Sequence, residues 1–258
     1  MQEQKKIRKP LYAGSFYPSE KKLLSEMINT FLKKSAQKKV NGKLRALVVP
    51  HAGYVYSGQV AAFAFSALKK ANPKRIILFG PSHQDFIEGA NSFEGKWITP
   101  LGSVDVLKNT LPFMENDNEH CLEVQVPFLQ KVLKKFVFIP IIYGEITAKN
   151  LTQTIEGFFE KDTVLIASSD LSHYFPYDLA KKADFESIDS ILKLDLNKFI
   201  ESGDACGKIG IAVLIILAKK YGWEPLLLEY KNSGDTSGNK NSVVGYASIA
   251  FVEKEGKK

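Results

Sequence analysis

Three short apolar runs, each followed by a histidine, constrain the fold of this chain more than any other feature. The runs occupy residues 44–50 (LRALVVP), 75–81 (RIILFGP) and 163–167 (TVLIA). The histidines that follow them are His51, His83 and His173. Short runs rich in Val, Ile and Leu and bounded by Pro, Gly or Ser are typical of buried parallel strands. Ligands of such sheets bind beyond the carboxyl ends of the strands, so we expect the three imidazoles to converge there.

The rest of the chain fits one α/β domain over residues 1–258. No low-complexity linker or repeat marks a boundary, and 258 residues can bury a sizeable core. We expect a central, mostly parallel sheet flanked by helices. No apolar run approaches the roughly 20 residues of a membrane-spanning helix, and the basic N-terminus lacks the apolar stretch of a secretory signal. These features predict a cytoplasmic protein with no membrane partner.

The basic charge favours an ordinary lysine-rich surface. The formal net charge is +7, but a nucleic-acid surface would interleave aromatic side chains with arginine, which is scarce here. We therefore expect no nucleic-acid partner. The two cysteines, Cys121 and Cys206, are too few for a disulfide framework or a four-thiolate zinc site.

Periodicity and turn residues predict several further elements. We expect a β-hairpin at residues 93–105 on the edge of the sheet and one helix over residues 116–135. Residues 178–199 should form a helix broken near Asp195. An apolar, buried helix is expected at residues 207–221.

His51, His83 and His173 make a plausible set of metal ligands. Neutral imidazole binds zinc, iron, copper and nickel, so the residue type alone does not choose the metal. Asp170 could bind the metal itself or accept a hydrogen bond from an imidazole N–H. It lies three residues before His173, so on one turn of helix both side chains could face the same way.

His120 and Glu123 are candidate catalytic residues at the start of the helix expected at residues 116–135. They are three residues apart and so share one helix face. Histidine titrates near neutrality and can act as a general acid or base. The alternative is a helix start that is stabilised by its own acidic residues.

Three other residues are candidates for a pocket, each with a structural alternative. Tyr54 could line the pocket or pack on the sheet. Cys206 precedes a likely helix start, which would favour a thiolate, or it is simply a buried free thiol. Asp235 lies in a polar loop and could reach the pocket or only connect two strands.

Seven stretches of the chain form a distinctive set: RKPLYAGSFYP, VVPHAGYVYSG, GPSH, NEHCLEVQVPFL, SSDLSHY, ACGKIG and SGDTSGNKNSVVGYAS. They resemble the Memo family (mediator of cell motility), and specifically its prokaryotic branch, AmmeMemoRadiSam system protein B. Together they run from Arg8 to Ser248, which is nearly the whole chain.

The resemblance implies a fold like that of the class III extradiol dioxygenases (LigB-like), which hold Fe(II) with two histidines and a carboxylate. On the matching motifs, His51, His83 and His173 take the metal positions and His120 the acid/base position. A third histidine thus stands where a carboxylate ligand is expected, and Asp235 stands near where some animal relatives have a cysteine. The resemblance also implies a setting with a radical SAM enzyme and a companion protein.

These observations lead to one main hypothesis and two alternatives. The main hypothesis is a metal-dependent, dioxygenase-like oxidoreductase with Fe(II), or else zinc or copper, acting on a small molecule or peptide. The first alternative is a partner protein whose pocket captures a peptide or modified side chain without turnover. The second is a metal-dependent hydrolase that uses a bound water.

Overall fold

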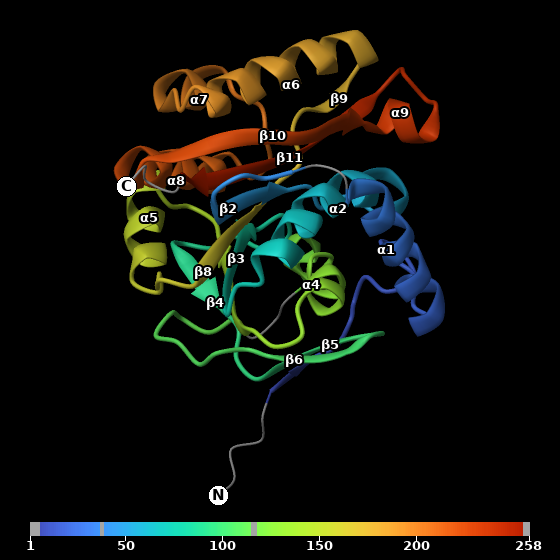
Figure 1. Ribbon diagram of the computed structural model, residues 1–258, viewed down its shortest axis with the longest axis vertical. Helices are drawn as coiled ribbons and strands as arrows, with labels where there is room; N and C mark the ends of the chain where they lie inside the picture. The colour runs from blue at the N-terminus through green and yellow to red at the C-terminus, as the bar shows by residue number, and fades with distance from the viewer. Residues whose placement is uncertain (1–5, 37–38, 115–117, 255–258) are drawn as a thin grey trace, which may run out of the picture.

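A computed structural model describes residues 6–36, 39–114 and 118–254, which form an α/β fold (Figure 1). The strands are β1 (Ile7–Arg8), β2 (Lys43–Val49), β3 (Arg75–Pro81), β4 (Ala90–Ser92), β5 (Lys96–Thr99), β6 (Gly102–Asp105), β7 (Val137–Tyr143), β8 (Thr163–Ser168), β9 (His173–Phe175), β10 (Trp223–Asn232) and β11 (Val243–Glu253). The helices are α1 (Lys21–Ser35), α2 (Tyr54–Ala71), α3 (His120–Glu123), α4 (Val126–Val132), α5 (Ala148–Glu156), α6 (Tyr177–Leu192), α7 (Leu196–Ser202), α8 (Lys208–Tyr221) and α9 (Ser233–Ser237).

The main sheet is mixed, with a parallel centre between antiparallel flanks. Its strand order is β10-β11-β2-β8-β3-β7-β4, and β9 pairs with β11. The neighbours β2, β8, β3 and β7 are parallel, whereas β10, β11 and β4 join antiparallel. The expectation of a mostly parallel sheet therefore holds only for the centre. The ten residues between β10 and β11 are too few for the crossover that a parallel pair needs, so these two strands pair antiparallel.

Helices cover both faces of this sheet, and strand alternation divides the core between them. On β2, Leu47 and Val49 join the core under α1, α2 and α4. Ala46 and Val48 point the opposite way and join the core under α5 and α8. The α/β architecture flanked by helices is thus confirmed, and Figure 1 shows α2 and α8 on either side of the central strands.

The predicted hairpin forms, but not on the edge of the main sheet. Strands β5 and β6 form the hairpin in a separate three-stranded sheet, in which β5 also pairs with β1, in the parallel direction. Buried Trp97 on β5 packs edge-on against Phe138 of β7, and this contact joins the small sheet to the main core.

Two helix predictions have different outcomes. The break near Asp195 is confirmed, because its carboxylate accepts a hydrogen bond from the Lys198 N–H and caps α7. The single helix expected over residues 116–135 is wrong in its described part. It divides into α3 and α4, with Pro127 in the first turn of α4, where a residue without an N–H is tolerated. Residues 115–117 lie outside the described residues.

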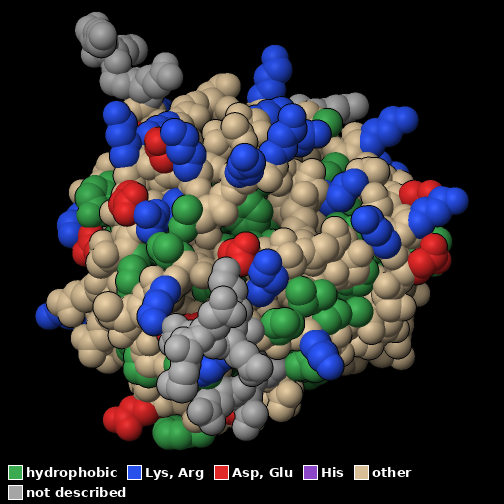
Figure 2. Space-filling model, turned by 90° about the horizontal axis from the view of Figure 1, so that it is seen from below, with side chains coloured by type: hydrophobic (Ala, Val, Ile, Leu, Met, Phe, Trp, Pro, Cys, Tyr) green, Lys and Arg blue, Asp and Glu red, His purple; other side chains and the backbone are tan. Residues whose placement is uncertain are grey.

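Lys and Arg side chains are spread over the face seen from below, with fewer Asp and Glu among them (Figure 2). Among the described residues, we find no helix with the length and apolar character needed to cross a bilayer.

Candidate metal centre

The carboxyl ends of the parallel strands bring three site segments to one edge of the sheet. His51 follows β2, His83 follows β3, and Asp170 follows β8. The strands are in register, with Val49 of β2 opposite Ser168 of β8. The segments that follow them therefore leave the sheet at the same level.

Three imidazoles meet there, and the third belongs to His120. Ring centroids of His51 lie 5.2 Å from those of both His83 and His120, which are 4.8 Å from each other. One ligand nitrogen from each ring lies within 4.8 Å of the other two. The sequence prediction had His173 as the third member, but the structure groups His120 with the strand-end pair. Helix α3 makes the difference, because it carries His120 across the end of β3.

Glu119 orients two of these rings. Its Oε1 lies 2.9 Å from the Nδ1 atoms of both His83 and His120, and its Oε2 accepts a 2.6 Å hydrogen bond from the His83 backbone N–H. Burial alone would raise the pKa of Glu119, but the hydrogen bonds from the two histidines hold it well below its usual range. An ionised carboxylate accepts from both Nδ1–H groups, so the Nε2 lone pairs stay free.

Ser168 fixes the tautomer of His51 in the same way. Its hydroxyl donates its one hydrogen to the Cys121 carbonyl at 2.7 Å. It must therefore accept from its other neighbours, the Gln125 amide at 2.9 Å and His51 Nδ1 at 3.0 Å. This assigns the proton of His51 to Nδ1 and leaves Nε2 unprotonated. Burial, followed by the neighbouring histidines, lowers the pKa of His51 well below its usual value, so the ring is neutral.

Asp170 lies beside this cluster and is buried. Its Oδ1 accepts a 2.7 Å hydrogen bond from the His51 backbone N–H. Burial raises its pKa to about 6, against the hydrogen bond from His51 and the attraction of His173. Asp170 thus holds the turn after β2, through the backbone of His51 and not through its imidazole.

His173 lines the same cavity as the three clustered histidines, from another wall. It opens β9 and pairs with Val244 of β11, so it does not share a helical turn with Asp170 as expected. The next residue, Tyr174, has a φ of 64°, a left-handed conformation that costs energy in a bulky residue. The strained turn places Tyr174 at the rim of the cavity, where 76% of the residue is exposed to solvent.

The cavity has a volume of about 570 Å³ and joins charged, aromatic and hydroxyl groups. Its aromatic lining residues are Phe16, Tyr56, Tyr174 and Tyr246. Residues of α9 and the loop after it add hydroxyls and an amide, from Ser233, Ser237, Asn239 and Ser242. Among its described lining residues there is no Lys or Arg.

Cys206 belongs to the site, but as a thiol. Its Sγ lies 3.2 Å from His51 Nε2 and accepts a 3.2 Å hydrogen bond from the Asp170 N–H. Burial and the Asp170 carboxylate raise the pKa of this thiol to about 12. Of the two alternatives that the sequence left open for Cys206, the structure therefore favours the free thiol, because desolvation outweighs the effect of the helix start on its pKa.

Three predicted site residues lie away from the cavity lining. Glu123 is turned to the N-terminal segment, where it pairs with Arg8 Nη1 at 2.5 Å. Tyr54 is buried in the core and donates to the Val124 carbonyl at 2.6 Å. Asp235 caps α9 by accepting from the Asn232 N–H, and so it connects β10 to that helix.

A family model described as Memo-like protein matches residues 8–250. The chain belongs to the Memo family. MEMO1 family proteins of Thermoplasma volcanium, Sulfolobus acidocaldarius and Nitrosopumilus maritimus are 37%, 39% and 35% identical to it. These matches cover 94%, 95% and 95% of this chain and 97%, 99% and 100% of the relatives.

The stretches by which the sequence resembles the Memo family meet at this cavity. VVPHAGYVYSG supplies His51, GPSH supplies His83, NEHCLEVQVPFL supplies His120, and ACGKIG supplies Cys206. The alternative of a helix start stabilised by its own acidic residues holds for Glu119, which caps α3. Sequence reasoning missed that Glu119 also orients two imidazoles and that Ser168 orients the third. Glu119 lies in the stretch NEHCLEVQVPFL and Ser168 in the stretch SSDLSHY. Each stretch also contains a histidine, and this closeness in sequence was the signal that could have identified them.

Proposed function

We propose that His51, His83 and His120 bind one iron(II) ion and that the chain is a metal-dependent oxidoreductase. The observation that carries this proposal is the fixed tautomer of all three rings. Each Nδ1–H has an acceptor, Glu119 Oε1 for His83 and His120 and the Ser168 hydroxyl for His51, so each Nε2 carries an unprotonated lone pair. The Cys206 thiol, 3.2 Å from His51 Nε2, would turn away when the metal binds. Metal-binding histidines typically have their other ring nitrogen engaged in this way.

The protein's own groups would divide the remaining work. Bound iron(II) would supply redox chemistry with oxygen. His173 lines the cavity outside the cluster, so we assign to it the proton transfer that the sequence analysis gave to His120. Phe16 packs on the His120 ring at 4.9 Å between centroids and excludes water from one side. The substrate, a small molecule or peptide, would enter past Tyr174.

Two further parts of the proposal rest on the family resemblance. One is a fold relationship to class III extradiol dioxygenases, which the histidines at parallel strand ends support. The other is a partnership with a radical SAM enzyme and a companion protein. A zinc-dependent hydrolase or a non-catalytic partner protein would use the same cavity. Measuring which metal the purified protein contains distinguishes these two alternatives from the iron-dependent oxidoreductase.

The test is elemental analysis of protein purified without oxygen or chelators, in parallel with two single-histidine variants. We expect iron in the unaltered protein, almost none in His120→Ala, and an unchanged content in His173→Ala. Both variants lose one imidazole from the same cavity, so each is the control for the other.

Other outcomes would overturn parts of the proposal. Loss of metal in His173→Ala with retention in His120→Ala would restore the ligand set predicted from sequence. Zinc that does not respond to oxygen would favour the hydrolase. A protein that binds no metal would leave the partner-protein alternative.

A further inference from the structure

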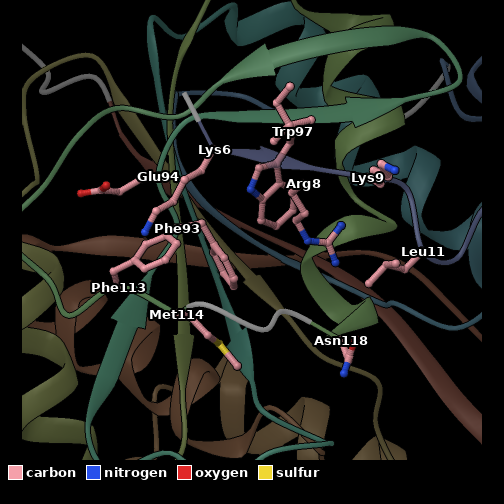
Figure 3. Close-up of a pocket in the computed structure, with 11 residues that line it drawn as sticks. Lys6, Arg8, Lys9, Leu11, Phe93, Glu94, Trp97, Phe113, Met114 and Asn118 are labelled. Atoms are coloured by element: carbon pink, nitrogen blue, oxygen red, sulfur yellow. The ribbon is translucent and has the colours of Figure 1, made fainter. Parts of the chain in front are cut away.

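A second cavity lies apart from the histidines, between the N-terminal strand β1, the start of β5 and the residues Phe113, Met114 and Asn118 (Figure 3). Its volume is about 560 Å³, within the range of small-molecule sites. None of its lining residues lines the histidine cavity. Its walls combine three aromatic rings with cationic side chains, and the proposed oxidoreductase function uses none of them.

Trp97 gives this cavity an unused hydrogen-bond donor. Its side chain is 1% exposed, and within the described part of the chain its Nε1 has no hydrogen-bond partner. The guanidinium of Arg8 covers one face of the ring at 4.3 Å. In Figure 3 the indole nitrogen is turned toward Lys6 and Phe93, on the cavity side. A buried N–H without an acceptor is costly, and a ligand oxygen would satisfy it.

The charge around this donor favours an anion. Lys6 Nζ lies 3.1 Å from the centroid of the Phe113 ring, and no ion pair joins it to a described carboxylate. Arg8 is already paired with Glu123. Glu94 lines the cavity, but Figure 3 shows its carboxylate directed away from the ring cluster. Lys6 is therefore a positive charge available to a ligand, and exposed Lys9 lines the same cavity.

We propose that this cavity binds a small aromatic carboxylate. The carboxylate accepts hydrogen bonds from the Trp97 N–H and the Lys6 ammonium, which matches the donors present. The ligand ring packs against Phe93 and Phe113, since aromatic rings prefer offset or edge contacts with one another. The site stands independently of the metal proposal, because the two cavities share no lining residue.

Tryptophan fluorescence tests the proposal directly, because the chain has two tryptophans. Trp223 packs on Phe159 and Tyr221, away from this cavity. In a Trp223→Phe background, titration with benzoate should change the Trp97 emission and reach saturation. Adding Lys6→Met should weaken binding about tenfold, the loss expected for one charge-assisted hydrogen bond. Lys149→Met, an exposed lysine on α5, is the matched control and should bind benzoate as before.

Three further titrations make the test decisive. Benzamide keeps the ring without the charge and cyclohexanecarboxylate keeps the charge without the ring, so both should bind more weakly than benzoate. His83→Ala should leave the benzoate response unchanged, because the metal centre is elsewhere. The proposal is overturned by an emission that does not respond to benzoate, by equal affinity for either analogue, by equal affinity in the two lysine variants, or by a response lost in His83→Ala.

Discussion

At the residue scale, Glu119 organises the histidine cluster that we propose binds metal. It is 1% exposed, and its Oε1 accepts from the Nδ1 atoms of both His83 and His120. The same carboxylate caps α3 by accepting from the backbone N–H groups of His120 and Cys121. Glu119 therefore both caps the start of α3 and orients two of the three imidazoles.

Glu119→Gln should weaken metal binding while the protein stays folded. An uncharged amide has one oxygen and one NH2 group, so its NH2 must face either the two Nδ1–H groups that share Oε1 or the His83 backbone N–H at Oε2. Removing such a partner typically lowers metal affinity about 10–100-fold. The measurement is competition with a chelator of known affinity for iron(II).

Glu186→Gln is the matched control, because Glu186 is an exposed residue of α6. It should leave the metal affinity unchanged. If Glu119→Gln binds metal as tightly as the control, then Glu119 acts only as a helix cap.

At the element scale, the N-terminal segment of residues 8–17 is held in place by Glu123. This buried carboxylate accepts from Arg8 Nη1, the Tyr12 backbone N–H and the Tyr17 hydroxyl, at 2.5, 2.8 and 2.6 Å. The segment in turn places Phe16 against His120. The residue expected to be catalytic is thus the anchor of one wall of the cavity.

Glu123→Gln should therefore lower the free energy of unfolding by about 3 kcal/mol, because it removes the negative charge from the largely buried Arg8–Glu123 ion pair. Urea denaturation of the metal-free protein measures this. Glu253→Gln removes the partner of Arg45 in a more exposed ion pair and should cost at most about 1 kcal/mol.

Glu123→Gln should still bind metal at saturation, since Glu123 does not line the histidine cavity. Unchanged stability together with lost turnover would instead support the catalytic role predicted from sequence.

At the scale of the whole molecule, one sheet supports two cores. Leu47 of β2 contributes to the core under α2, and Leu165 of β8 contributes to the core under α8, both fully buried. Their strands are hydrogen-bonded neighbours in the same sheet. The two cores should therefore unfold together, as the prediction of one domain requires.

Leu47→Ala and Leu165→Ala should each lower the free energy of unfolding by about 3 kcal/mol, through lost burial and the cavity left behind. Each variant should still show one cooperative transition in calorimetry, with calorimetric and van't Hoff enthalpies in agreement. Leu226→Ala, at a partly exposed position on β10, is the control and should have a small effect. Two separate transitions in either core variant would show that the faces are independent units.

The sequence by itself determined the three central strands β2, β3 and β8 and the family. Apolar runs bounded by Pro, Gly and Ser are local signals, and they located β2, β3 and β8 together with His51 and His83 beyond the first two. The break at Asp195 was equally local, since a helix cap depends on a few neighbouring residues.

Only the tertiary structure decided which side chains meet. His120, His173 and Glu123 lie on short segments without a strong pattern, and their positions depend on long-range contacts. Glu119 links His83, beyond the carboxyl end of β3, to α3. The pairing of β9 with β11 fixes the position of His173, and residues 8–17 hold Glu123 in place. These partners are distant along the chain, so spacing could not reveal them. The third histidine of the cluster was therefore set by packing and not by sequence pattern.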